Sequence, residues 1–430
     1  MHQAFVNRER ELAELDVAAA AGGLLVVFGR RRVGKTRLLR HWLAERDGLY
    51  SQAIEAPRDL QIGQIVHDLR ARWSTDIIPK TWSEWLELLA LQKGRWTLCL
   101  DEFPYLVAGD PSLPSRLQAW LDHRMPRGCL LILSGSSTRM MNDVFLNRAA
   151  PLFGRARKLL HLVPMDYGAF CRACRFDAAD AASFERFACV GGIPKYWEAV
   201  EPKQDAVALA EALYFGFTPY MEQEPQRLLA DEGVTGLNGL AILEAIGRGA
   251  ERPSEIAARM GTRQTNLSRL FQLLLDGSIL VRELPYGESV RTTKRVLYRI
   301  QDPAMRFWFR VFSPHQTLWR TFPAAKKRTL VHEHASTVFE DVCRARVPGA
   351  RRYWEAGVEI DLVAPDPDED DGLLVAEIKW KRVSAAERGR LLKDLEARWT
   401  RTAIAARHPK VRFDVIDAGR LSAIGKSATK

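Results

Sequence analysis

Apolar residues occur along this chain in two patterns, as short uninterrupted runs and as stripes that recur every three or four positions. Such runs lie at 24–28, 96–100 (with one threonine, Thr97) and 129–133, and lead into glycine, acidic or hydroxyl residues. Such runs are typical of strands buried on both faces of a parallel sheet. Helical spacing marks residues 5–21 and 112–123. Alternating buried strands and amphipathic helices predict an α/β domain with a parallel sheet.

A phosphate-binding motif follows the first run. Residues 24–36 read LLVVFGRRRVGKT, which contains the pattern G-x4-G-K-T. Glycines in this pattern permit a tight loop whose N–H groups surround phosphate, while the lysine contacts the β- and γ-phosphates and the threonine hydroxyl binds Mg²⁺. The helical residues that follow would direct the positive end of a helix at the same phosphates. The predicted nucleotide-binding residues are Gly29, Arg30, Arg31, Arg32, Val33, Gly34, Lys35, Thr36 and Arg37.

Carboxylates and hydroxyls end the next two runs. Asp101 and Glu102 follow the second run, at the strand end where open α/β sheets bind ligands. We expect Asp101 to hold Mg²⁺ and Glu102 to polarise the water that attacks the γ-phosphate. Ser134, Ser136 and Ser137 end the third run. They either contact the γ-phosphate or the attacking water, or cap the following helix; the two roles are compatible.

The remaining signals of the N-terminal half are less specific. The pattern predicts helical segments throughout 49–93 and again from 166 to about 225. Arg155 precedes a further strand-like run; it either stabilises transition-state charge, in its own subunit or a neighbour, or is an ordinary surface arginine. The segment GGIPKYW, 191–197, punctuates the second helical region and is predicted to form the hinge of a lid over the nucleotide.

Residues 238–300 contain three short helical segments followed by two strand-like runs. This order predicts a winged helix-turn-helix, a module that binds DNA, binds proteins or has only a structural role. Seven polar or basic side chains would face a DNA groove from its third helix and its wing. They are Arg263, Gln264, Asn266 and Arg269 on the helix and Arg291, Lys294 and Arg295 on the wing.

Two further strand-like runs, VEIDLVAPD and LLVAEIKWK, flank an acidic segment that we expect to be a solvated hairpin tip. If the runs pair as a hairpin, Asp361 and Glu377 converge with Lys379 beside them. Carboxylates that hold Mg²⁺ beside a lysine suit metal-assisted hydrolysis of a phosphodiester. The alternative is a partly exposed hairpin with ordinary charged residues.

Length and charge limit the possible classes of protein. A chain of 430 residues is too long for one ordinary core, and the predicted domains are 1–165, 166–235, 236–312 and 326–416. The net charge of +10 permits a polyanionic partner without requiring one. No apolar run reaches the roughly 18 residues of a membrane span, and the N-terminus lacks a signal-peptide core. We therefore expect a cytoplasmic protein that does not enter a membrane.

Taken in order, the motifs resemble a known family over residues 4–415. They are FVNRERELAEL, FGRRRVGKTRLL, LCLDEFPYL, LILSGSS, PLFGR, GGIPKYW, YRIQDPAMRFWF and FE…EIDLVA…AEIKWK. They are similar to the prokaryotic AAA+-type ATPases of the archaeal ATPase family, which carry a C-terminal DUF234 domain related to PD-(D/E)XK nucleases. The resemblance implies a P-loop ATPase core, a helical lid, a winged helix-turn-helix and a nuclease-like α/β domain.

The resemblance also implies roles for individual residues. Thr36 and Asp101 would bind Mg²⁺ with ATP, Lys35 and Glu102 would be catalytic, and Ser136 would sense the γ-phosphate. The implied nuclease-like centre consists of Glu340, Asp361, Glu377 and Lys379, the first three as metal ligands and the last two as catalytic groups. Ile360 stands where the nuclease superfamily has its name-giving proline, so the sequence departs from the pattern of that superfamily at this position.

We therefore expect an ATP hydrolase coupled to DNA binding, with DNA cleavage by the C-terminal domain as a further hypothesis. The alternative is a nucleotide-switched regulator that binds DNA or protein and keeps an inactive nuclease-like domain. A third hypothesis is an ATPase that acts on a protein partner, and a homo-oligomer is also compatible with the sequence.

Overall fold

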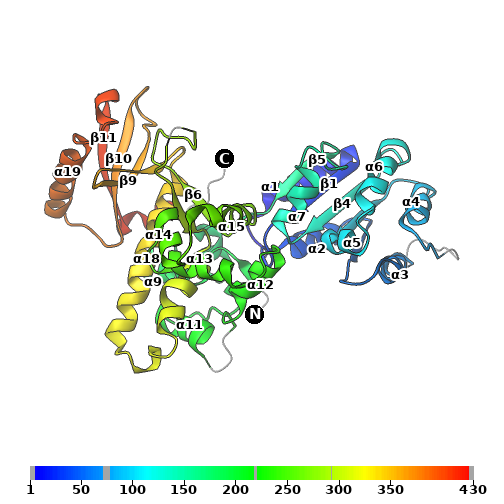
Figure 1. The fold of residues 1–430 in the computed structure, drawn as a ribbon, viewed down its shortest axis with the longest axis horizontal. Coiled ribbons are helices and arrows are strands. Elements are labelled where there is room, and N and C mark those ends of the chain that lie inside the picture. The colour runs from blue at the N-terminus through cyan, green and yellow to red at the C-terminus, as the bar shows by residue number, and fades with distance from the viewer. Residues whose placement is uncertain (1–4, 71–77, 217–219, 292, 426–430) are drawn as a thin grey trace.

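The computed structural model describes residues 5–70, 78–216, 220–291 and 293–425. It has two lobes, an N-terminal α/β lobe and a larger lobe of helices and two small sheets (Figure 1). Within the described ranges, no helix is both long and apolar enough to cross a membrane.

A five-stranded parallel sheet forms the core of the N-terminal lobe, in the order β2-β3-β4-β1-β5. Its strands are β1 (Gly23–Phe28), β2 (Gly48–Gln52), β3 (Thr97–Asp101), β4 (Leu130–Gly135) and β5 (Ala156–His161). Its helices are α1 (Glu9–Ala21), α2 (Lys35–Leu43), α3 (Arg58–Leu69), α4 (Trp82–Ala90), α5 (Phe103–Gly109), α6 (Leu113–His123) and α7 (Thr138–Phe145). The predicted α/β class and parallel sheet are confirmed.

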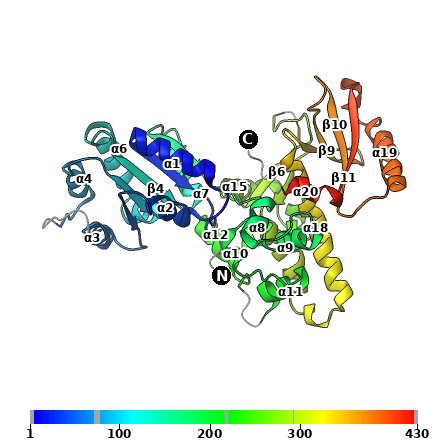
Figure 2. The ribbon, with the colours of Figure 1, turned by 180° about the vertical axis from the view of Figure 1, so that it is seen from behind.

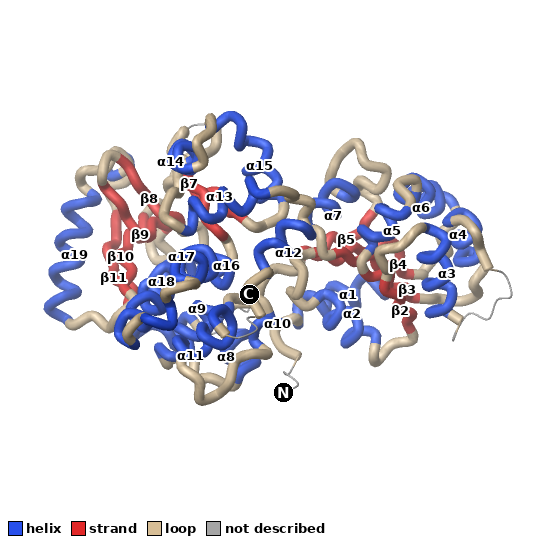
Figure 3. The backbone as a smooth tube through the Cα atoms, turned by 60° about the horizontal axis from the view of Figure 1, so that its bottom comes forward, coloured by secondary structure: helices blue, strands red, loops and turns tan. Residues whose placement is uncertain are grey.

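Helices cover both faces of this sheet (Figure 3). Leu25 and Val27 of β1 belong to the same hydrophobic core as residues of α1 and α2. Leu24 and Val26 belong to a second core with residues of α4, α5 and α6. Because successive side chains of a strand point to opposite faces, an apolar run without polar interruptions is what a strand covered on both sides requires.

Strand β2 corrects the sequence prediction, which had helical segments throughout 49–93. Gly48–Gln52 pairs in parallel with β3 at the edge of the sheet. An edge strand has a partner on one side only, and most side chains of β2 are half-buried. The segment GLYSQ therefore lacks the continuous apolar run by which buried strands are recognised.

The chain then enters the second lobe. The region after β5 contains α8 (Tyr167–Cys174), α9 (Ala181–Val190), α10 (Pro194–Trp197), α11 (Ala206–Ala210), a π-helical turn (Glu211–Phe215) and α12 (Glu224–Asp231). It is followed by α13 (Leu237–Gly247), α14 (Pro253–Arg259), α15 (Gln264–Asp276) and an antiparallel pair, β6 (Leu280–Glu283) and β7 (Leu297–Ile300). These are the three helices and two strands that the pattern predicts at 238–300.

A four-stranded mixed sheet, in the order β11-β10-β9-β8, forms the C-terminal part of this lobe. Its elements and the helices before it are α16 (Pro303–Phe307), a π-helical turn (Trp308–Phe312), α17 (Ser313–His315), α18 (Ala324–Arg346), β8 (Arg351–Glu355), β9 (Val358–Pro365), β10 (Leu373–Lys379), α19 (Ala385–Trp399), β11 (Val411–Asp417) and α20 (Leu421–Ile424). Strands β9 and β10 pair antiparallel, as the predicted hairpin requires.

The long helix α18 joins the C-terminal sheet to the preceding helices. Its Phe339 packs edge-on against Phe184 of α9, with ring centroids 5.5 Å apart, and against Trp380 next to β10 at 5.0 Å. Helix α20 returns to α8, as Figure 2 shows, where Gly168 and Gly425 lie so close that a Cβ on the former would meet the carbonyl oxygen of the latter. The helical region and the C-terminal sheet thus share one hydrophobic core.

Candidate active site

The phosphate loop connects β1 to α2. Gly29 and Gly34 have φ angles of 151° and 103°, in the region that favours glycine. A Cβ on Gly29 would lie 2.3 Å from the carbonyl oxygen of Leu162, so a larger residue would displace the backbone. Both glycine positions of the motif are therefore occupied by the residue type that the loop geometry needs.

Lys35 begins α2 and lies inside the loop. Its side chain is 4% exposed, and Nζ donates to the carbonyl oxygens of Gly29, at 2.8 Å, and Arg30, at 3.2 Å. Burial lowers the pKa of Lys35, against the opposing effect of Glu102 and Asp101. Two backbone carbonyl oxygens of the loop thus hold the Lys35 ammonium group, and they bind it more weakly than charged phosphate oxygens would.

Thr36 and Asp101 meet although 65 residues separate them. The Thr36 hydroxyl donates to Oδ2 of Asp101 at 2.6 Å. Asp101 is fully buried, and its Oδ1 accepts the backbone N–H of Glu102 at 3.0 Å. A hydroxyl and a carboxylate in contact form an all-oxygen donor pair, the type that Mg²⁺ prefers, so the residues present fit this cation.

Glu102 has a left-handed backbone, with φ 57° and ψ 43°, which is uncommon outside glycine. Its Oε2 accepts hydrogen bonds from the side chain and the backbone of Ser136, at 2.7 and 3.2 Å. Ser137 instead caps α7 by accepting from the N–H of Met140, whereas Ser134 is buried in β4. The three serines thus have three different environments, and Ser136 is the one that contacts the predicted catalytic carboxylate.

The three loop arginines pair with carboxylates of the second lobe. Arg30 donates to Asp302 at 2.6 Å and to the Tyr196 hydroxyl at 3.1 Å. Arg31 and Arg32, by contrast, pair with the two ends of α12. Their partners are Asp231, at 3.3 Å, for Arg31, and Glu224 for Arg32.

A cavity of about 370 Å³ lies beside the phosphate loop. Its lining comprises Arg31, Arg32, Gly34, Lys35, Thr36, Arg37, Glu102, Pro194, Lys195 and Glu198. The side chains of Arg30 and Val33 are buried in the protein interior and do not line this cavity, so only their backbone N–H groups are left for the predicted contact with phosphate. The segment GGIPKYW contributes Pro194 and Lys195 and therefore reaches the phosphate loop, as a lid would.

Pro194 also borders a smaller pocket with Phe5, Val6 and Trp197. The Phe5 ring stacks on His41 of α2, with centroids 4.0 Å apart. This pocket has a volume of about 30 Å³, and its lining also includes Gly34 of the phosphate loop and two arginines, Arg8 and Arg37.

Arg155 lies elsewhere. It forms a bidentate ion pair with Asp122 of α6, at 2.8 Å for the shortest contact, and donates to carbonyl oxygens of its own loop. It does not line the phosphate-loop cavity. The structure therefore separates Arg155 from the nucleotide site of its own chain.

The four predicted residues of the C-terminal centre are neighbours. Oδ2 of Asp361 accepts the N–H of Ile378 at 2.8 Å, and Lys379 donates to Glu377 at 2.5 Å. Burial and the nearby Asp361 raise the pKa of Glu340 to about 7. Burial and Glu377 raise the pKa of Asp361.

Arg398 of α19 joins this centre without any sequence signal. It pairs with Glu377 at 2.6 Å, so that Glu377 has cations on both carboxylate oxygens. Among the residues that the structure describes, no three His, Cys, Asp or Glu side chains gather closely enough to hold a metal ion. The centre, as it stands, is an ion-paired cluster.

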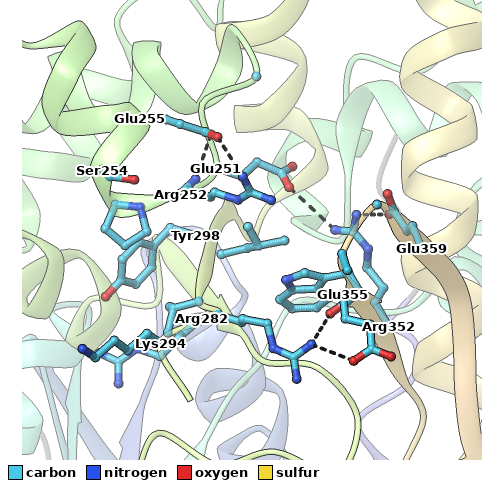
Figure 4. Close-up of a pocket in the computed structure, with 18 of the residues that line it drawn as sticks. Glu251, Arg252, Ser254, Glu255, Arg282, Lys294, Tyr298, Arg352, Glu355 and Glu359 are labelled. Atoms are coloured by element: carbon cyan, nitrogen blue, oxygen red, sulfur yellow. Dashed lines mark hydrogen bonds and ion pairs between the residues drawn. The ribbon is translucent and has the colours of Figure 1, made fainter. Parts of the chain in front are cut away.

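A cleft of about 1020 Å³ separates the predicted wing from the C-terminal sheet (Figure 4). Arg352 of β8 reaches across it toward Glu251, at 3.7 Å, and pairs with Glu359 of β9. Arg295, predicted to face DNA, instead donates to the carbonyl oxygen of Trp354 at 2.8 Å and pairs with Glu288 and Glu355. Arg295 therefore belongs to a contact between the wing and the C-terminal sheet.

The other six predicted DNA-facing side chains are exposed. They are Arg263, Gln264, Asn266, Arg269, Arg291 and Lys294.

A parallel sheet, a glycine-bounded loop around a buried lysine, and a strand-end acid beside a threonine define a P-loop ATPase. Residues 5–200 match the family model described as an ATPase domain predominantly from Archaea, and residues 308–391 match that of archaeal and bacterial proteins of unknown function, DUF234. The chain thus combines the ATPase domain of the archaeal ATPase family with a DUF234 segment, as the motifs predicted. It is an ATP hydrolase.

Two proteins are similar to this chain over most of its length. An uncharacterized protein of Methanocaldococcus jannaschii is 27% identical over 414 residues, which cover 91% of each chain. A Walker-type ATPase of Pyrococcus abyssi has a similar structure, with a TM-score of 0.50 and 20% identity over 71% of this chain and 96% of that chain. The second likeness concerns the fold alone.

Proposed function

We propose that this chain is a Mg²⁺-dependent ATP hydrolase whose nucleotide state controls DNA binding by its second lobe. The observation that supports coupling is that arginines of the phosphate loop pair with carboxylates of α12. One set of guanidinium groups thus borders the nucleotide cavity and contacts the second lobe at the same time.

In this proposal, Thr36 and Asp101 hold Mg²⁺, which would neutralise phosphate charge. Lys35 exchanges the carbonyl oxygens of Gly29 and Arg30 for the β- and γ-phosphates. Glu102 accepts a hydrogen bond from the attacking water once Ser136 no longer occupies its carboxylate. The two hydrogen bonds from Ser136 hold Glu102 in a resting position.

Arg31 and Arg32 supply the coupling. A triphosphate carries more charge than a carboxylate and binds guanidinium groups strongly, so it competes with Asp231 and Glu224. Helix α12, which carries both carboxylates, packs against α13, the first helix of the predicted winged module. Nucleotide binding would therefore loosen α12 and the module behind it.

The DNA part of the proposal is supported by charge and exposure. The chain has a net charge of +10. Arg263, directly before α15, and Arg269, within it, are exposed together with two amide side chains of that helix. Amide and guanidinium side chains on one helix suit the edges of bases in a major groove.

The test is ATP hydrolysis by the wild type and Lys35→Ala, with and without DNA of several topologies. Stimulation of the wild type by one topology, lost in Lys35→Ala, is expected. DNA affinity should also fall steeply with salt because counterions are released from phosphates. Hydrolysis without any effect of DNA would instead favour a protein partner.

A second candidate is the regulator with an inactive nuclease-like domain. The ion pairs of Glu377 with Lys379 and Arg398 favour it, because they occupy a carboxylate that a metal would need. Incubation of DNA with wild type and Asp361→Ala in Mg²⁺ or Mn²⁺ decides between an active and an inactive nuclease-like domain. Nicking that disappears in Asp361→Ala would establish cleavage, whereas uncut DNA with ATP-dependent binding would establish the regulator.

Because Arg155 lies away from the nucleotide cavity of its own chain, its proposed role is to act on the nucleotide of a neighbouring subunit. A mixture of Arg155→Ala and Lys35→Ala chains should regain hydrolysis if this is so, because each chain supplies what the other lacks.

A further inference from the structure

The carboxylate of Asp101 receives a second hydroxyl that no motif includes. The Tyr50 hydroxyl donates to Oδ2 of Asp101 at 2.7 Å, and Thr36 donates to the same oxygen at 2.6 Å. With the Glu102 N–H on Oδ1, three donors hold this buried carboxylate in one orientation.

Tyr50 is itself fixed between two elements of the site. It lies on β2, where it pairs in register with Cys99 of β3, two residues before Asp101. Its ring lies under the guanidinium of Arg40, 4.6 Å from the ring centroid. Arg40 follows Thr36 by one helical turn, so both residues lie on the same side of α2.

These contacts form a closed ring of residues. Thr36 and Arg40 lie on one side of α2, Arg40 packs over the Tyr50 ring, and Tyr50 and Thr36 both donate to Asp101. We propose that Tyr50 is a positioning residue for the metal-binding pair Thr36 and Asp101, with Arg40 as its support. This inference rests on the proposed Mg²⁺ role of that pair.

The physical reason is the rotational freedom of a carboxylate. A cation needs its oxygen ligands already in place, and a fixed carboxylate loses less conformational freedom on binding than a mobile one. The Thr36 hydroxyl can donate its proton to Asp101 and still offer a lone pair to a cation. Tyr50 holds the same carboxylate oxygen with a second hydroxyl and, in this proposal, acts through Asp101 rather than on the cation itself.

The test compares Tyr50→Phe with the wild type. Phenylalanine keeps the ring under Arg40 and removes only the hydroxyl. The binding of a fluorescent ATP analogue is titrated in EDTA and over a range of Mg²⁺ concentrations, and hydrolysis is followed over the same range. We expect the half-saturating Mg²⁺ concentration to rise about tenfold or more, as the loss of one hydrogen bond to a charged group implies, with unchanged affinity in EDTA.

Ser51→Ala is the matched control. Ser51 lies next to Tyr50 on β2, but its hydroxyl donates to Asp68 of α3 at 2.6 Å, away from the phosphate loop. Its Mg²⁺ curve should coincide with that of the wild type. Thermal unfolding of both variants shows whether either loses stability.

Identical Mg²⁺ curves for Tyr50→Phe and wild type would overturn the inference, as would an equal shift in Ser51→Ala, which would indicate a general effect on β2. A wild type whose nucleotide affinity does not respond to Mg²⁺, or a Thr36→Ala variant with a normal Mg²⁺ curve, would contradict the metal pair itself. The failure of the proposed site is thus distinguishable from the failure of this inference.

Discussion

At the scale of single residues, the predicted catalytic groups are occupied by partners that the reaction would replace. Lys35 donates to loop carbonyl oxygens, and Glu102 accepts from Ser136. The loop carbonyl oxygens and Ser136 are neutral, so each forms a weaker hydrogen bond than the charged or reacting group that would replace it. The side chains that the proposed reaction uses therefore have hydrogen-bond partners that phosphate oxygens or a water molecule could replace.

Glu102→Gln should separate binding from hydrolysis. Glutamine keeps the shape of the side chain but cannot accept a proton from water, so we expect hydrolysis to fall by about 100-fold or more. Affinity for a fluorescent ATP analogue should stay within a factor of about two to three. Phosphate release and equilibrium titration measure the two quantities. An equal loss of affinity and hydrolysis would assign Glu102 to binding instead.

His334 should make stability depend on pH. It is fully buried on α18, its Nε2 donates to the carbonyl oxygen of Ala188 at 2.9 Å, and burial lowers its pKa to about 3. The unfolded chain takes up a proton near pH 6.5 and the folded chain does not, so the folded state loses stability as the pH falls below 6.5. Between pH 7 and pH 5 the loss amounts to about 2 kcal/mol.

Urea unfolding at both pH values measures this loss in wild type and in His334→Gln, which should lack that part of the pH dependence. His332→Gln is the control, because His332 lies two residues away on the same helix and is exposed. A loss that is equal in all three proteins would contradict the assignment to His334.

At the scale of elements, α7 links the end of β4 to the second lobe. Ser137 caps it from within, and Glu232, just after α12, accepts from the N–H groups of Thr138 and Arg139 at 3.0 Å each. The first N–H groups of a helix have no acceptor within the helix and attract a negative charge. A carboxylate of the second lobe thereby completes a helix that begins beside the predicted sensor, Ser136.

Removing this carboxylate should destabilise the protein. Glu232→Ala leaves two buried N–H groups without an acceptor, which costs about 2 kcal/mol or more. Equilibrium unfolding in urea measures the change, and Glu396→Ala, at an exposed position of α19, is the control. A change below about 0.5 kcal/mol would show that water or another side chain replaces Glu232.

At the scale of the whole molecule, the two lobes meet through charges as well as packing. Arg30, Arg31 and Arg32 each pair with a different carboxylate of the second lobe. Only the last two line the nucleotide cavity. The Arg30 pair with Asp302 is buried on both sides and holds the lobes together, whereas the other two pairs are open to competition by phosphate.

The double variant Glu224→Gln, Asp231→Asn should therefore bind ATP more tightly, by about threefold or more, since the phosphates no longer compete with carboxylates. Titration with a fluorescent ATP analogue measures this affinity. Asp302→Asn is the control: it should lower the unfolding temperature and leave the affinity unchanged. A weaker affinity in the double variant would show that Arg31 and Arg32 need these carboxylates for their orientation.

The local pattern of the sequence determined the central strands, the phosphate loop and the residues at the strand ends. Each of these depends on neighbours in the chain: a buried strand needs an apolar run, and a loop around phosphate needs glycine and lysine at set spacings. The hairpin that brings Asp361 close to Glu377 also followed from alternation along two adjacent segments.

Only the tertiary structure decided the rest. The strand β2 and its Tyr50, the Arg398 pair with Glu377, and the contact of Arg295 with β8 have no periodic signal, because an edge strand needs few apolar side chains and an ion pair needs none. Arg30 and Asp302 are 272 positions apart. In a sequence rich in charged residues, each charged side chain has many residues of opposite charge with which it could pair. Only the packed structure selects one of them.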